Sequence, residues 1–487
     1  MPRIRSNVLR LIYFLCASYF LCASICFAQQ DTGVITGVIT DPSGSPIPNA
    51  AVVLLNTETN ASMTVNADSN GLFVATPLRI GVYTISVEAS GFKKSVREKI
   101  LLRVQDRIRV DFRMEVGQVS ETIQINADAS LLQSETTSLG QVIATKPVSE
   151  LPLNGRNFVQ LIALTPGAYI PQKNNSLYQD FLIGINGNRI QNNNFLLDGI
   201  NNNTTDNNQA PILPSPDAIA EFKVQSNLLS AEFGRGLGGT INISLRSGTN
   251  QFHGVLFEFL RNDKLDANNF FNVGRERPLF QQNQFGGAMG GPVYIPKLYN
   301  GRNRTFFFAD YEGTRIRKGL TRIFTVPTDA MRNGDFSGLA PIFDPTKTSV
   351  DSEGRTIRQP FEGNRIPADR MDPIMQKFLA LYPEPNLPGI ANNYIFNPKY
   401  NDNNDQGDIK LNHVMSESDS FMFRFSRGDR TFVVPLDIPG LPYNGYFAAQ
   451  EFLPQVINDR GAVLSHTHTF SPRMVNEALF GFNRLYA

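Results

Sequence analysis

Four histidines are the residues of this chain best suited to metal chemistry: His253, His413, His466 and His468. None of them has the His-Glu-x-x-His or His-x-x-Glu spacing of a zinc peptidase. His466 and His468 are two residues apart, so both would lie on one face of a strand, where a pair of imidazoles can bind a metal ion. No third ligand lies near them in the sequence. We therefore expect a pair of histidines on a strand face and no metal site.

Two further motifs resemble ligand-binding loops but lack part of the pattern. Gly234-x-Gly236-x-x-Gly239 has the spacing of a dinucleotide fingerprint, but β-branched residues follow where a helix is needed. Asp402–Gly407 begins like a calcium loop, but its twelfth position is His413 instead of a bidentate Glu. With no Gly-x-Ser-x-Gly elbow either, we expect no enzyme activity and no cofactor.

The N-terminus has the pattern of an export signal. Arg3, Arg5 and Arg10 precede the apolar run Leu11–Phe27, and small residues stand before Gln29. This pattern predicts a signal peptide, residues 1–28, that is cleaved after Ala28. The alternative is a membrane anchor, for which the run is short.

Cleavage after Ala28 would remove every cysteine, because Cys16, Cys22 and Cys26 all lie before it. The mature chain then has no disulfide, no Cys-zinc site and no thiol catalysis. Its net charge changes from +1 to −2 with the loss of three arginines, so no basic surface for nucleic acid is expected. The many Gly and Pro residues, 38 and 30 of them, favour β-structure over helix bundles.

Residues 31–115 alternate short β-type runs with turn signals, as small β-sandwiches do. The segment resembles the carboxypeptidase regulatory-like, or Cna-B-like, family in three motifs: Gly37–Ala50, Asp68–Phe73 and Gly81–Tyr83. The resemblance implies a β-sandwich. As a function we favour a spacer or docking module, with glycan binding as the alternative.

Residues 116–138 form a linker with one alternating stretch, Val119–Ala127, that could add as a strand to the sheet edge of a partner. This stretch resembles the TonB box of TonB-dependent outer-membrane transporters, with Asn126 where that family commonly has Thr. The resemblance assigns TonB docking to Glu121, Thr122, Ile123, Gln124 and Ile125. The alternative is that these residues form the last strand of the sandwich.

Residues 139–249 contain several motifs in an order that resembles the plug domain of TonB-dependent receptors, especially the Oar-like branch. They are LPLNGRNF (151–158), NNFLLDGI (193–200), DAIAEFKVQSN (217–227) and AEFGRGLGGTINISLRSGTNQFHG (231–254). From the residues themselves we expect a small α/β unit with glycine-lined turns.

Residues 250–487 show longer alternating strands. Phe421, Phe423 and Phe425 would share one face and Arg424 the other, which is the apolar-out, polar-in pattern of a transmembrane barrel. We assign Val255, Phe257 and Phe259 to an apolar face in the same way. An ordinary antiparallel sheet has the same period. The motifs RNDKLDANNFF, NQFGGAMGGPV and RTFFFADYEGTR resemble the first barrel strands of Oar-like receptors, and residues 327–405 would be a long extracellular loop.

The predicted fold is therefore mainly β: an N-terminal β-sandwich, a small α/β plug domain and the first strands of an incomplete transmembrane β-barrel. We count about eight strand candidates, whereas the resemblance to TonB-dependent receptors implies a barrel of 22 strands. An open edge in lipid is costly, so we expect a fragment of a longer receptor. The resemblance implies energised uptake at the cell outer membrane. The partners would be a TonB-type complex, outer-membrane lipid and an unidentified ligand, an oligosaccharide or a peptide among others. The alternative is a non-transporting surface protein for carbohydrate binding or adhesion that uses the sandwich.

Overall fold

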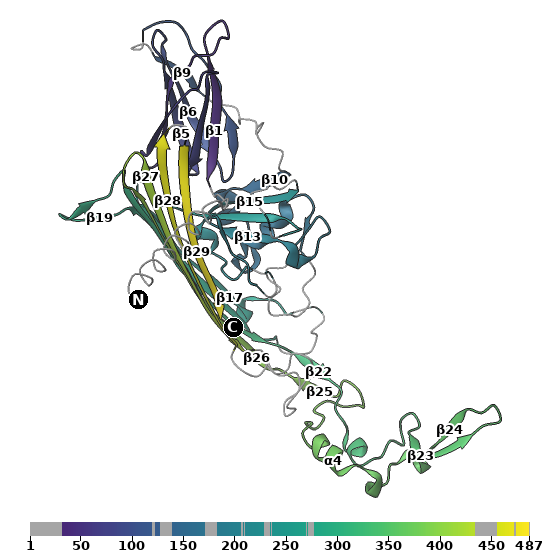
Figure 1. Ribbon diagram of the computed structural model, residues 1–487. Coiled ribbons are helices and arrows are strands. Elements are labelled where there is room, and N and C mark those ends of the chain that lie inside the picture. The colour runs from purple at the N-terminus through teal and green to yellow at the C-terminus, as the bar shows by residue number, and fades with distance from the viewer. Residues whose placement is uncertain are drawn as a thin grey trace, which may run out of the picture.

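The computed structural model describes residues 32–118, 122–126, 139–170, 183–205, 208, 210–227, 234, 236–268, 270, 277–433, 455–471 and 474–486. These residues are mainly β and form three modules in chain order: a β-sandwich, a small α/β module and a long antiparallel sheet (Figure 1). The predicted signal peptide lies outside the described residues. Within the described ranges, no helix has both the length and the apolar character needed to cross a membrane.

The first module is a sandwich of two sheets. One sheet contains β4 (Leu72–Leu78), β1 (Gly33–Thr40), β7 (Arg107–Arg109) and β8 (Phe112–Arg113). The other has the order β3 (Ser62–Asn66), β2 (Ala51–Asn56), β5 (Gly81–Glu88), β6 (Lys94–Leu102) and β9 (Thr122–Asn126). Every second residue of β1 is buried, and Ile35, Leu54 and Ile85 from the two sheets meet in one apolar core.

The second module occupies the region that the sequence predicts to be a plug, and we call it the plug below. It has a five-stranded sheet with short helices beside it. The strand order is β10 (Leu139–Ile143), β15 (Ile219–Asn227), β16 (Thr240–Leu245), β13 (Asn194–Leu197) and β14 (Ile200–Asn201). The remaining elements are α2 (Thr145–Glu150), η1 (Asn154–Arg156), η2 (Phe158–Leu164), β11 (Ala168–Tyr169), β12 (Gly184–Ile185), η4 (Ile190–Asn192) and η5 (Pro216–Ala218). β16 is buried along its whole length, so the plug has its own apolar core. The glycines of the dinucleotide-like motif lie just before β16, so a strand follows them where a dinucleotide site would need a helix.

The third module is a seven-stranded antiparallel sheet in which each strand pairs with the next one along the chain. Its strands are β17 (His253–Asn262), β18 (Phe280–Pro292), β21 (Thr305–Gly319), β26 (Lys399–Val414), β27 (Asp419–Val433), β28 (Gln455–Ser471) and β29 (Met474–Tyr486). Among the described residues, β17 and β29 are both edges and the sheet does not close. Figure 1 shows the plug against one face of this sheet and the sandwich at one end of it.

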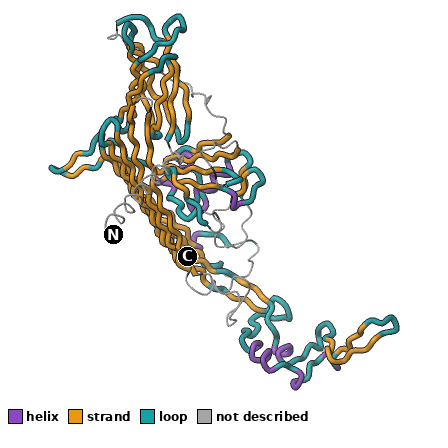
Figure 2. The backbone as a smooth tube through the Cα atoms, viewed as in Figure 1, coloured by secondary structure: helices purple, strands orange, loops and turns teal. Residues whose placement is uncertain are grey.

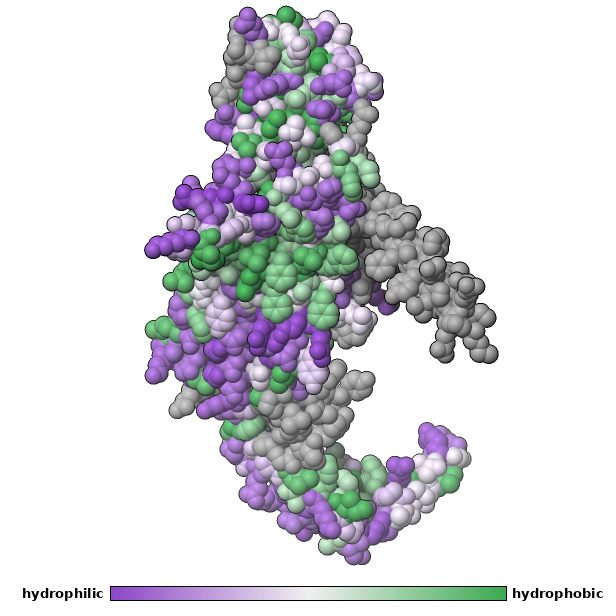
Figure 3. Space-filling model, turned by 60° about the vertical axis from the view of Figure 1, so that its left-hand side comes forward, coloured by the Kyte–Doolittle hydropathy of each residue, from purple (hydrophilic) through white to green (hydrophobic). Residues whose placement is uncertain are grey.

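The two faces of the long sheet differ in polarity. The inner face, toward the plug, carries buried polar side chains such as Gln284, Glu312 and Asp408. Exposed apolar side chains gather on the outer face, where Figure 3 shows a hydrophobic band between two hydrophilic ones. We call them the apolar belt: Leu256, Met289, Ile409, Leu411, Phe423, Phe425, Leu464, Phe480 and Phe482. The predicted alternation of Phe423 and Phe425 with Arg424 is therefore present.

β17 reverses the expected orientation. The pairing of Glu258 with Phe285 puts Glu258 on the outer face, so Phe257 and Phe259 lie on the inner face instead of the outer one. Both rings lie under the guanidinium of Arg156, a plug residue. The cation–π contact explains why aromatic residues occupy inner positions on this strand.

The connections at the two ends of the sheet differ in length. Near the sandwich, β26 and β27 are joined by residues 415–418, and β28 and β29 by residues 472–473. At the far end, residues 320–398 connect β21 to β26 and extend away from the sheet (Figure 2). The predicted loop 327–405 ends too late, because β26 already begins at Lys399.

The far loop contains short elements of its own. They are β22 (Arg322–Phe324), α3 (Asp329–Arg332), β23 (Phe343–Val350), β24 (Thr356–Pro360), η7 (Glu362–Asn364), η8 (Ala368–Arg370), α4 (Pro373–Leu379) and β25 (Tyr394–Phe396). Shorter pieces elsewhere are η6 (Asp263–Leu265), β19 (Tyr294–Ile295) and β20 (Tyr299–Asn300). An ion pair of 2.9 Å between Arg370 and Asp344 holds the loop together and lowers the pKa of the Asp344 carboxyl.

Candidate functional site

A buried ion cluster joins the plug to the inner face of the long sheet. Asp198 lies in the turn between β13 and β14 with a positive φ of 47°, followed by Gly199 at 77°. Its Oδ1 accepts hydrogen bonds from Lys410 Nζ on β26 at 2.8 Å and from the backbone N–H of Leu245 at 3.0 Å. Arg424 Nε on β27 lies 3.4 Å from the other oxygen. All three charged side chains are almost completely buried, so each depends on the others for compensation of its charge.

A second polar contact is made by Arg156, which belongs to the LPLNGRNF motif. Its Nη2 donates to Asp217 of the plug at 2.6 Å, and its Nε donates to Glu312 of β21 at 3.1 Å. The guanidinium carbon lies 4.0 Å from the ring centre of Phe257. One side chain thus bridges the plug and two strands of the sheet, and a planar guanidinium is suited to such multiple contacts.

The sandwich is attached to the plug through the loop between β6 and β7. The carboxylate of Glu221 on β15 accepts the backbone N–H of Val104, and Lys223 Nζ donates to the carbonyl of Gln105 at 3.0 Å. Lys223 also lies 3.9 Å from Asp106. Burial at this contact raises the pKa of Glu221 to about 7 and lowers the pKa of Lys223.

The sandwich also contacts the long sheet. Arg79 donates to the side chain of Asn412 and, at 3.2 Å, to the carbonyl of Phe421. Where the three modules meet they line an open cavity of about 590 Å³, and its lining includes Glu58, Arg246 and His253.

The predicted docking residues lie at the edge of the sandwich. Glu121 is outside the described residues, whereas Thr122, Ile123, Gln124 and Ile125 belong to β9. β9 pairs in parallel with β6, in a register that joins Lys94 to Thr122 and continues to Asn126, and it is the last strand of its sheet. The described docking residues therefore form the last strand of the sandwich, as the alternative interpretation of the sequence predicted.

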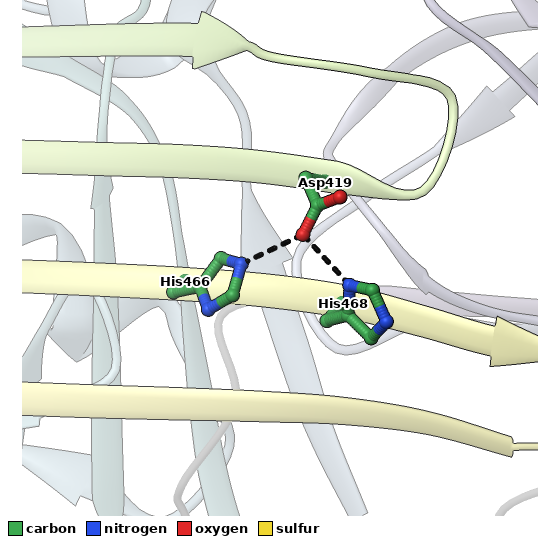
Figure 4. A group of neighbouring side chains, drawn as sticks. All are labelled: Asp419, His466 and His468. Atoms are coloured by element: carbon green, nitrogen blue, oxygen red, sulfur yellow. Dashed lines mark hydrogen bonds and ion pairs between the residues drawn. The ribbon is translucent and has the colours of Figure 1, made fainter.

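The four histidines lie in different environments. His253 is exposed at the start of β17, and His413 contacts Thr305 Oγ1 through Nδ1 at 2.7 Å. His466 and His468 share one face of β28, as the sequence predicts. It is the outer face of the sheet, and both side chains contact Asp419 of β27 (Figure 4). Asp419 is a potential third ligand that sequence spacing did not reveal.

The ion cluster was not evident from the sequence. The sequence placed Arg424 on the polar face of its strand, but the buried partner of Arg424 and Lys410 is Asp198, more than two hundred residues away. The available signal was a pair of cations at inner positions of two predicted strands, which require an acidic partner once they are buried.

Comparison with known proteins defines the class. The family model described as "Outer membrane beta barrel domain" matches residues 244–487, and the chain belongs to this family. The model of the "Carboxypeptidase regulatory-like domain" matches residues 34–115. The chain is also 27% identical over 393 residues to the TonB-dependent transporter Oar of Myxococcus xanthus, covering 77% of this chain and 33% of that protein. It thus spans about a third of the length of this relative.

Two solved structures are similar to this chain at low sequence identity. The outer membrane transporter YddB from Escherichia coli has a TM-score of 0.42 and 11% identity, over 71% of this chain and 39% of that one. The siderophore receptor PirA from Acinetobacter baumannii has a TM-score of 0.41 and 13% identity, over 72% and 40%.

Proposed function

We propose that this protein is a TonB-dependent outer-membrane receptor that takes up a substrate with energy from a TonB-type complex. The observation that carries the proposal is the plug, a folded module held against the polar inner face of an outer-membrane sheet by the Asp198 cluster. Similarity to the transporter Oar supports the same class. The substrate would bind at the end of the sheet that carries the long loops.

In this proposal TonB docks by strand addition at Glu121, Thr122, Ile123, Gln124 and Ile125. The geometry of β9 supports it, because β9 pairs with β6 on one side only among the described strands. No described strand pairs with its other edge, where a partner strand could add through backbone hydrogen bonds. TonB would therefore not need to displace β9 from the sandwich.

The route from the docking strand to the plug is short. β9 ends at Asn126, and the next described element, β10, begins at Leu139 as the edge strand of the plug sheet. Among the described strands, β10 pairs only with β15, in an antiparallel register from Leu139 to Ile143. Tension on the docking strand would thus reach the plug at an edge strand of its sheet, while the Asp198 cluster resists movement of the rest.

Cysteine cross-linking tests the docking, because the predicted mature chain contains no other cysteine. We expect the Gln124→Cys variant to form a disulfide with a TonB that carries one cysteine in its receptor-binding strand. The matched control is Ser45→Cys, in an exposed turn of the sandwich, which should not cross-link. Adding Ile123→Pro to the Gln124→Cys variant should abolish the cross-link, since proline removes a backbone donor.

Equal cross-linking at positions 45 and 124, or none at either, would contradict docking at this segment. A surface-binding protein that does not engage TonB would then be the better description.

A further inference from the structure

Three side chains from two adjacent strands converge on the outer face of the long sheet. Asp419 pairs with His468 in the strand register, and Phe421 pairs with His466. Asp419 Oδ1 lies 3.0 Å from His466 Nε2 and 2.7 Å from His468 Nδ1, and the three potential ligand atoms all lie within 4.8 Å of one another. Figure 4 shows both imidazoles pointing toward the same carboxylate oxygen.

The surrounding residues hold these side chains in their orientations. The second oxygen of Asp419 accepts hydrogen bonds from Ser416 Oγ at 2.9 Å and Ser418 Oγ at 3.1 Å. The ring of Phe421 stacks on His466 at 4.4 Å between centres. Hydrogen bonds to the far oxygen of a ligating carboxylate and packing around the imidazoles are the outer contacts that metal sites use to fix their ligands.

The cluster is also accessible. The side chains of Asp419, His466 and His468 are 25%, 35% and 30% exposed, so an ion can reach them from solvent. They lie beside the apolar belt, on its sandwich side, because the next outer positions along β27 and β28 are Phe423 and Leu464.

We propose that Asp419, His466 and His468 bind one divalent transition-metal ion of the zinc or nickel type. Two imidazole nitrogens and one carboxylate oxygen suit such ions, whereas calcium and magnesium require oxygen ligands. Donor atoms about 2.0–2.1 Å from one zinc ion lie roughly 3 Å apart. The distances of 3.0 and 2.7 Å from Asp419 Oδ1 to the two imidazole nitrogens are close to this value. Three protein ligands leave a fourth position for water.

The bound ion would fasten β27 to β28 at the end of the sheet that contacts the sandwich. Phe421, which stacks on His466, also accepts the hydrogen bond of Arg79 through its carbonyl. The site is therefore next to the sandwich contact, and its existence does not depend on docking to TonB.

Metal binding is tested on the full-length protein, purified in detergent without a histidine tag and stripped with a chelator. Zinc is then titrated in competition with a chromophoric chelator. We expect one equivalent to bind, with the affinity reduced at least tenfold in His468→Gln and in Asp419→Asn. The matched control is His413→Gln, which removes an outer-face histidine of the neighbouring strand and should leave the affinity unchanged.

A second measurement needs no variant. The thermal unfolding midpoint of the stripped wild-type protein should rise on addition of zinc and fall back when the chelator is restored. The proposal is overturned if the wild-type protein binds no equivalent of zinc, or if His468→Gln and His413→Gln bind it equally well. In that case the three residues form a hydrogen-bonded cluster without a metal.

Discussion

Asp198 and Lys410 form an ion pair of 2.8 Å between a tight turn of the plug and the inner face of β26 in the long sheet, and both side chains are almost fully buried. Neither charge has access to bulk water. The pair, together with Arg424, therefore makes the position of the plug depend on a small number of electrostatic contacts.

Removal of one partner should loosen the plug. Lys410→Met leaves Asp198 with Arg424 as its remaining cationic partner, and we expect a cost of about 3 kcal/mol, or roughly a hundredfold increase in local opening. Hydrogen exchange of residues 194–201 measures this opening. Lys399→Met, at the exposed start of the same strand, is the control. Unchanged protection in Lys410→Met would show that the cluster does not hold the plug.

Arg156 should not be replaceable by lysine. An ammonium group cannot contact Asp217, Glu312 and the ring of Phe257 together, so Arg156→Lys should weaken the contact between plug and sheet by about 1–2 kcal/mol. The readout is protease accessibility of the plug in the detergent-purified protein. Arg189→Lys, an exposed plug position, is the matched control and should behave like the wild type. Equal accessibility in both variants would contradict the bridging role.

The contact between sandwich and plug should depend on pH through Glu221. Because burial raises its pKa to about 7 in the assembled state, that state binds more protons than the separated one between pH ~4.5 and ~7. The contact should therefore be strongest below this window and weaken as pH rises to 7. Spin labels at Ser69→Cys and Ser149→Cys, both exposed, report the distance between the modules.

In this experiment the distance distribution should broaden between pH 5 and pH 8. Glu221→Gln keeps an acceptor for Val104 but cannot titrate, so its distribution should be the same at both pH values. A wild-type distance distribution that narrows with rising pH would contradict this explanation, because it would mean that the contact becomes stronger.

The apolar belt should tolerate no charge. Phe423→Arg puts a cation on the outer face next to Leu411 and Leu464, where we expect a cost of about 2–4 kcal/mol if this level faces the lipid interior. The amount of folded protein in outer membranes should fall. Glu417→Arg, in the exposed turn beyond the belt, should assemble normally. Equal assembly of the two variants would show that Phe423 does not face lipid.

Local patterns predicted most of the strands. The alternation around Phe423 is a property of adjacent residues, so the period of two was visible without the fold.

Contacts between distant segments were not predictable in the same way. The third potential ligand, Asp419, meets His468 only because β27 and β28 pair in one particular register. The orientation of Phe257 and Phe259 was predicted wrongly because their partner, Arg156, belongs to another module. Single-sequence periodicity reports that two faces exist, but the neighbouring module decides which face is the apolar one.

The contact surface between the plug and the long sheet is mainly polar, which has a thermodynamic consequence. Apart from Ala288 and Phe308, the sheet contributes few side chains to the apolar core of the plug, whereas residues such as Ile241 and Phe222 are buried inside the plug itself. Moving the intact plug away from the sheet would expose mainly polar groups, and the heat-capacity change would be small. Unfolding the plug would expose its core and give a large positive change. The heat-capacity change measured by calorimetry can therefore distinguish a plug that separates from the sheet as a folded module from a plug that unfolds.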